Sequence, residues 1–116
     1  MIAVIFEVWP EPEHKGAYLD IAAQLKFELE QIDGFISVER FQSLTDEGKV
    51  LSLSFFKDEV AVKAWRNLPS HRAAQKAGRE QLFAGYRLRI ASVVRDYSKL
   101  EREQAPLDSV AVHAQS

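Results

Sequence analysis

The alternation of apolar and polar positions predicts four β-strands in residues 1–97. These strands cover residues 2–9, 35–44, 50–56 and 86–97, where β-branched and aromatic side chains are common. The first strand is apolar on both faces except at Glu7, which is typical of a strand covered on both sides. Residues 45–48 have the composition of a turn, so we expect the second and third strands to pair as an antiparallel hairpin.

Two helical regions lie between the predicted strands. Residues 13–32 carry apolar side chains every three or four positions, and Gly34 follows, where the end of a helix favours glycine. The second region begins after Asp58, whose carboxylate is suited to cap a helix, and Pro69 interrupts it. We expect Ser70 to cap a second helical piece that lasts to about residue 83.

The order strand, helix, strand, strand, helix, strand predicts an α+β fold of the ferredoxin-like βαββαβ kind. Such a fold has a four-stranded antiparallel sheet with two helices on one face. The other face would expose several large apolar side chains to water, namely Ile5, Trp9, Leu51, Leu53 and Phe55. We therefore predict a two-fold symmetric homodimer in which two sheets pack together. Residues 1–97 form the domain, and we expect the polar tail 98–116 to pack on the partner subunit.

Composition excludes several classes of function. The net charge is only −2 without a basic stripe, so binding to nucleic acid or to an anionic membrane has no electrostatic support. The absence of cysteine excludes disulfides, thiolate metal sites and a thiol nucleophile. The first residues, MIAVIFEVWPEPEHK, lack a basic leader, and no apolar run is long enough for a membrane helix, so we expect a cytoplasmic protein. The three histidines have no metal-ligand spacing, and we expect neither a metal nor a cofactor.

The inward face of the second helical region predicts a hollow between helix and sheet. This face combines Trp65 and His71 with small residues such as Ala74 and Gly78, and His71 and Gln75 share one side of the helix. An alternative interpretation is that the small residues only let the helix approach the strands. In that case Trp65 belongs to the core and His71 is partly exposed.

Two charged strand residues are further candidates for this hollow. Glu7 interrupts an apolar strand and needs a partner or water, so it either lines the cavity or pairs with Arg87 or Arg89. Arg87 is a candidate for anchoring an anionic oxygen of a substrate. Alternatively, the arginines of the last strand form salt bridges or dimer contacts.

Three segments resemble the antibiotic biosynthesis monooxygenase (ABM) domain family of the dimeric α+β barrel superfamily. They are LSLSFFKDEVAVKAW, SHRAAQKAG and YRLRIASVVRDYS, and the resemblance extends over residues 1–97. It implies the same fold and a dimer. Members of the superfamily include cofactor-independent oxygenases of phenols and quinols, haem-degrading enzymes and small proteins without an established activity.

The resemblance also assigns roles to single residues. Trp65 matches a tryptophan that many oxygenases of the family place in the cavity, and His71 falls where other members have a polar or aromatic cavity residue. Ala61 replaces an asparagine important in some of those members. The haem-degrading branch has a histidine where this chain has Gln75 and an asparagine where it has Glu7, so the resemblance disfavours haem degradation.

The candidate residues and the family resemblance together predict that the protein is a cofactor-independent monooxygenase that acts on a small aromatic quinol or polyphenol. His71 would act as the base, because an ordinary histidine titrates near neutral pH, and Trp65 would supply a stacking surface. The predicted substrate contacts are Glu7, Gln75, Gly78 and Arg87. A non-catalytic, small-molecule-binding or stress-associated dimeric module is the alternative.

Overall fold

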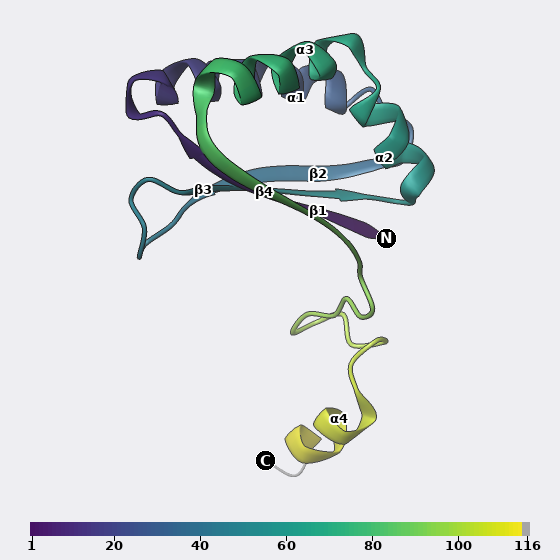
Figure 1. Cartoon of the computed structure of the whole chain (residues 1–116). Coiled ribbons are helices and arrows are strands. Elements are labelled where there is room, and N and C mark those ends of the chain that lie inside the picture. Colours follow the sequence, from purple (N-terminus) through teal and green to yellow (C-terminus); the bar gives the residue numbers. More distant parts are fainter. Residues whose placement is uncertain (115–116) are drawn as a thin grey trace.

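The computed structural model describes residues 1–114, in which helices cover one face of a four-stranded antiparallel sheet (Figure 1). The elements follow one another as β1 (Ile2–Pro10), η1 (Pro12–His14), α1 (Lys15–Leu29), β2 (Phe35–Gln42), β3 (Val50–Phe56), α2 (Glu59–Arg66), α3 (Pro69–Ala77), η2 (Gly78–Leu82), β4 (Phe83–Ser92) and α4 (Leu107–Ala114). The order of the strands in the sheet is β2-β3-β1-β4. The predicted ferredoxin-like arrangement is therefore confirmed.

Local residue chemistry explains how α2 and α3 begin, whereas the predicted end of the first helix is wrong. Instead of residues 13–32, α1 spans Lys15–Leu29 with Glu30 as its C-cap. Gly34 lies beyond this cap in the turn before β2, where its φ of 91° is a left-handed conformation that glycine adopts at low cost. The carboxylate of Asp58 caps α2, since its Oδ1 accepts a hydrogen bond of 2.9 Å from the backbone N–H of Ala61. The predicted cap at Ser70 is wrong. Pro69 already starts α3, where its missing N–H costs nothing, and the Ser70 hydroxyl instead donates to the carboxylate of Glu28.

The last strand begins and ends earlier than the sequence predicts. Instead of residues 86–97, β4 spans Phe83–Ser92. Its bounds follow from its partner β1, because Pro10 pairs with Phe83 at one end and Ile2 pairs with Ser92 at the other. No residue of β1 remains to pair with the chain beyond that point, and a strand without a partner loses its backbone hydrogen bonds.

The two faces of the sheet differ in their cover. Val4, Val8 and Phe56 point toward the helices and are fully buried. The opposite face carries Ile5 and Leu53, which are register partners and remain only partly buried. In Figure 1, α1, α2 and α3 all lie on the first face. No helix covers the opposite face, which is the face predicted to form the dimer.

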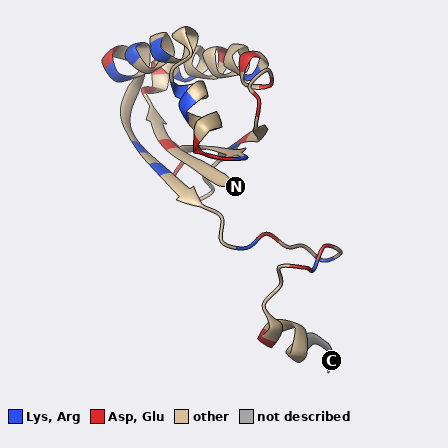
Figure 2. Cartoon of the chain, turned by 90° about the vertical axis from the view of Figure 1, so that its right-hand side faces the viewer, with Lys and Arg blue, Asp and Glu red and all other residues tan. Residues whose placement is uncertain are grey.

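The chain after β4 leads away from the domain (Figure 1). The radius of gyration is 17.1 Å, larger than the roughly 13 Å expected for a compact chain of this length. The described part of the tail ends in α4, a helix that was not predicted from the sequence. Figure 2 shows basic residues on the helices and on β4, with acidic residues among them. Within residues 1–114, no helix is both long and apolar enough to cross a membrane.

Candidate active site

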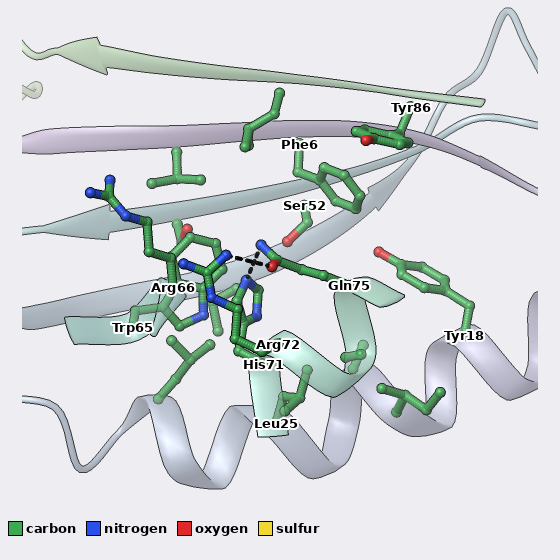
Figure 3. Close-up of a pocket in the computed structure, with 18 of the residues that line it drawn as sticks. Phe6, Tyr18, Leu25, Ser52, Trp65, Arg66, His71, Arg72, Gln75 and Tyr86 are labelled. Carbon is green, nitrogen blue, oxygen red and sulfur yellow. Dashed lines mark hydrogen bonds between the residues drawn. The ribbon is translucent and has the colours of Figure 1, made fainter. Parts of the chain in front are cut away.

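A largely apolar cavity of about 380 Å³ lies between the helices and the sheet. Its floor comes from the helix-facing residues of the strands, and its roof comes from α1, α2, α3 and η2 (Figure 3). The polar groups that reach it from the roof and the floor include Tyr18, Ser52, Ser54, His71, Gln75 and Tyr86. A cavity of this size and character is typical of a small-molecule site.

Trp65 and His71 lie side by side at one end of the cavity (Figure 3). Their ring centroids are 4.2 Å apart and the ring planes are inclined by 42°. The break before Pro69 produces this contact, because α3 starts a new direction and carries His71 in its first turn. Trp65 also packs against the core residue Phe56, with centroids 5.6 Å apart. Trp65 therefore serves the core and lines the cavity at once.

Gln75 fixes the tautomer of the His71 imidazole. Arg72 Nη1 donates to Gln75 Oε1 over 3.3 Å, so the amide NH₂ group faces His71. The distance from Gln75 Nε2 to His71 Nε2 is 3.1 Å, and Nε2 of the neutral ring must then accept this hydrogen bond. The ring proton consequently sits on Nδ1, which is buried and has no hydrogen-bond partner among the described residues.

The surroundings of His71 keep its ring neutral. Burial is the larger cause and the positive charge of Arg72 the smaller one, and together they lower the pKa of His71 from 6.5 to about 4. The expected pKa near neutrality is therefore wrong for His71 without a ligand, because the ring is buried and lies close to the charge of Arg72. At neutral pH the imidazole is unprotonated but is a weak base.

Gly78 leaves room for one of the aromatic side chains that line the cavity. The residue is buried at the start of η2, and a Cβ atom placed there would overlap the ring of Phe83. Phe83 in turn lines the cavity and contacts two other aromatic rings, with centroid distances of 5.8 Å to Phe6 and 5.4 Å to Tyr18. Gly78 thus lets an aromatic wall stand close to the helix, but it is not itself part of the cavity lining.

Glu7 and Arg87 lie on the opposite face of the sheet, so the structure does not bring them to the cavity. Both alternate with residues that point toward the helices, and Glu7 pairs with Arg87 in the β1–β4 register. The Glu7 carboxylate forms ion pairs with Lys49 and Arg89. The hydrogen bond from Lys49 is the largest cause that lowers the pKa of Glu7. Of the two alternatives for Glu7, the structure has the ion pair with Arg89.

The cavity also contains residues that the sequence analysis missed. Four arginines line it, namely Arg40 from β2, Arg66 from α2, Arg72 from α3 and Arg79 from η2. Alternation along β2 could have assigned Arg40 to the helix-facing side together with Val38. Among residues 1–114, no group of three or more His, Asp or Glu is placed to hold a metal ion.

The family of the chain follows from comparison with known proteins. Residues 1–77 match the model of the family described as antibiotic biosynthesis monooxygenase. The chain belongs to this family. A curated relative, "Jasmonate monooxygenase ABM" from Pyricularia oryzae, is 45% identical over 93 residues. The match covers 80% of this chain and 43% of the relative, so the chain spans less than half the length of that protein.

Solved structures support the antibiotic biosynthesis monooxygenase fold. Rv0793 from Mycobacterium tuberculosis superposes with a TM-score of 0.75 at 18% identity, over 84% of this chain and 98% of that one. A putative antibiotic biosynthesis monooxygenase from Deinococcus radiodurans gives a TM-score of 0.76 at 14% identity, over 84% and 97% of the two chains. At these identities the likeness shows the fold alone.

Proposed function

We propose that the chain is a monooxygenase whose cavity binds a small aromatic phenol or quinol and promotes its direct reaction with O₂. The observation that carries this proposal is the contact of Trp65 with His71 on the wall of a largely apolar cavity. Trp65 supplies a surface on which an aromatic ring can stack. His71 supplies an unprotonated nitrogen in the same place.

The reaction needs no electrons beyond those of the substrate. Loss of a hydroxyl proton converts a hydroquinone into an anion that can give one electron to O₂. The resulting semiquinone and superoxide combine at a ring carbon to form a hydroperoxide. Loss of water then leaves a hydroxyquinone, so one oxygen atom enters the product, the other leaves as water, and the substrate supplies all four electrons.

The cations around the cavity assist the first step. A phenol has a pKa of about 10, so transfer of its proton to an imidazole with a pKa of about 4 costs about 8 kcal/mol in the absence of other charges. Positive charges near the hydroxyl stabilise the phenolate and reduce this cost. We therefore propose that His71 accepts the proton at Nε2 when the hydrogen bond from Gln75 opens, and that the lining arginines favour the anion.

Oxygen uptake tests this function. The purified protein, treated with a chelator, is incubated with a panel of hydroquinones and polyphenols, and labelled ¹⁸O₂ identifies the oxygen atom in the product. We expect turnover by the wild type and a large loss in His71→Gln and Trp65→Leu. His14→Gln removes a histidine outside the cavity lining and serves as the matched control. Wild-type turnover no faster than that of His71→Gln would reject the catalytic role of His71.

Jasmonate is a second candidate substrate, favoured by the name of the relative with 45% identity. It joins the panel with and without an added chemical reductant, because hydroxylation of a saturated carbon needs two electrons that this carbon does not supply. Binding of any of these compounds without oxygen uptake under either condition would favour the non-catalytic, small-molecule-binding alternative.

We further propose that two copies pair through the sheet face opposite the helices. The support is the row of apolar side chains on that face, including Ile5, Leu53 and Phe55, which stay partly exposed in one chain. Sedimentation should give a dimer, and Ile5→Lys should give a monomer. A wild-type monomer at 100 μM would exclude the proposal.

We also propose that residues 98–116 pack on the partner subunit. Since the chain has no cysteine, Val110→Cys offers a single site for a spin label. In a mixed dimer, the label should broaden NMR signals from residues 1–97 of an isotopically labelled, unmodified partner. Broadening confined to the tail region would contradict this proposal.

A further inference from the structure

The charge of the cavity is opposite to that of the chain. The chain has a net charge of −2, yet four arginines line the cavity, and no Asp or Glu of the described chain does. The described residues form two ion pairs, and both involve Glu7 on the other face of the sheet. Among the described residues, therefore, no carboxylate lies within ion-pair distance of the four guanidinium groups. A cluster of cations that lacks counter-ions favours an anionic ligand.

Arg40 is the arginine best placed to bind such a ligand. It is a floor residue of the cavity on β2, and its Nε atom is buried without a hydrogen-bond partner among the described residues. A buried donor without a partner is costly and is commonly satisfied by a ligand or water. Arg72 differs, because its guanidinium already donates to Asn67 Oδ1 over 2.7 Å and to Gln75.

The strand register places Arg40 at the polar end of a row across the cavity floor. Arg40 pairs with Ser52 on β3, Ser52 pairs with Phe6 on β1, and Phe6 pairs with Leu88 on β4. Side chains of directly opposite residues lie about 5 Å apart on the same face of a sheet. The floor therefore changes from a cation and a hydroxyl to apolar side chains within the length of a small molecule.

Aromatic rings surround the apolar end of this row. The ring of Phe6 lies 5.9 Å from that of Tyr86, and Phe83 lies 6.1 Å from Tyr86. Figure 3 shows Phe6 and Tyr86 together at the strand side, with Ser52 between Phe6 and Gln75. Such a cluster suits a planar, apolar body rather than a second charged group.

We propose that the substrate of this cavity is a carboxylate-bearing aromatic molecule, with its carboxylate on Arg40 and Ser52 and its ring over Phe6 toward Tyr86 and Phe83. A guanidinium group matches a carboxylate because two parallel N–H donors meet two oxygen acceptors. The proposal rests on the proposed function for the reaction that follows, but binding of the acid can be measured without it.

The test compares an acid with its neutral ester. The probes are 2,5-dihydroxybenzoate, which is both a hydroquinone and a carboxylate, and its methyl ester. Dissociation constants are measured by calorimetry without oxygen, so that no turnover occurs. A hydrogen-bonded charge contributes enough that we expect the acid to bind the wild type about 10- to 100-fold more tightly than the ester. Arg40→Gln should abolish this preference and leave the affinity for the ester nearly unchanged.

Two variants keep the outcome unambiguous. Arg87→Gln removes the same charge from the opposite face of the sheet and should retain the full preference for the acid. Arg40→Lys keeps the charge without the planar group and should retain only part of it. Failure of the acid to bind the wild type, equal binding of acid and ester, or an equal loss for both probes in Arg40→Gln would overturn the proposal.

The result is separable from the proposed function. Preference for the acid without oxygen uptake would support the carboxylate site and remove the monooxygenase. Oxygen uptake with neutral hydroquinones, without a preference for the acid, would support the monooxygenase and remove the carboxylate site. Circular dichroism of Arg40→Gln establishes that the variant is folded before either comparison is made.

Discussion

The neutral state of His71 should make the stability of the protein depend on pH. Burial keeps the folded-state pKa of His71 at about 4, whereas the ring of the unfolded chain titrates near 6.5. Between these two values the unfolded state binds a proton that the folded state does not. Stability therefore falls as the pH is lowered through this window, and the effect vanishes above pH 6.5.

The magnitude follows from the separation of the two pKa values. Each pH unit between them corresponds to about 1.4 kcal/mol, so the gap between 6.5 and about 4 is about 3 kcal/mol in the free energy of unfolding. The charged groups that line the cavity beside His71 are arginines, which do not titrate in this range. The part of the stability loss at low pH that is due to this ring should therefore disappear in His71→Gln.

Urea denaturation of the wild type and His71→Gln at pH 7.5 and pH 4.5, at equal protein concentration, measures this difference. Other ionisable groups affect both proteins alike. Since pH 4.5 lies slightly above the folded-state pKa of about 4, the variant should lose roughly 2.5 kcal/mol less than the wild type. NMR of the ¹⁵N-labelled ring gives a direct check, because at neutral pH the ring should carry a single proton and this proton should lie on Nδ1. A ring that titrates near 6.5, or a proton on Nε2, would refute the argument from burial and from the Gln75 contact.

Substitutions at Gly78 and Asp58 test the packing around the cavity and the start of α2. Gly78→Ala should destabilise the fold by about 1–3 kcal/mol, because the new methyl group overlaps the Phe83 ring, whereas Gly16→Ala, with open space around it, should be neutral or slightly stabilising. An equal effect of both substitutions in urea denaturation would contradict the packing argument. Asp58→Ala should cost about 1 kcal/mol through loss of the cap on the Ala61 N–H, and Asp58→Asn should restore most of it.

The order of the elements could be predicted because local signals agree with the tertiary structure. Asp58 fixes the start of α2 through its carboxylate, and this position was predicted correctly. The end of α1 was predicted wrongly, because the apolar spacing continues to Ile32 although the helix ends at Leu29. The end of β4 could not be predicted in this way. The strand stops at Ser92 because its partner begins at Ile2, and the composition of residues 93–97 contains no trace of that limit.

The candidate site was only half predictable for a related reason. Helical spacing was sufficient to bring His71 and Gln75 to one face, and the structure places both in the cavity lining. Glu7 and Arg87 were proposed from residue type alone, and strand alternation sends them to the other face. The pKa of His71 also depends on burial, which no local pattern specifies.

The positive charge of the cavity could not be predicted from the sequence either. Each of the four belongs to a different element, and in a chain with a net charge of −2 none stands out from the sequence. Only the packing of helices over the sheet collects their charges around one cavity and leaves the acidic residues outside it. An anion in that cavity would offset the repulsion among them and would oppose the part of the His71 pKa shift that comes from Arg72, whereas the larger part, which comes from burial, would remain. The charge of the ligand would therefore favour proton transfer to His71, and the burial of the ring would still oppose it.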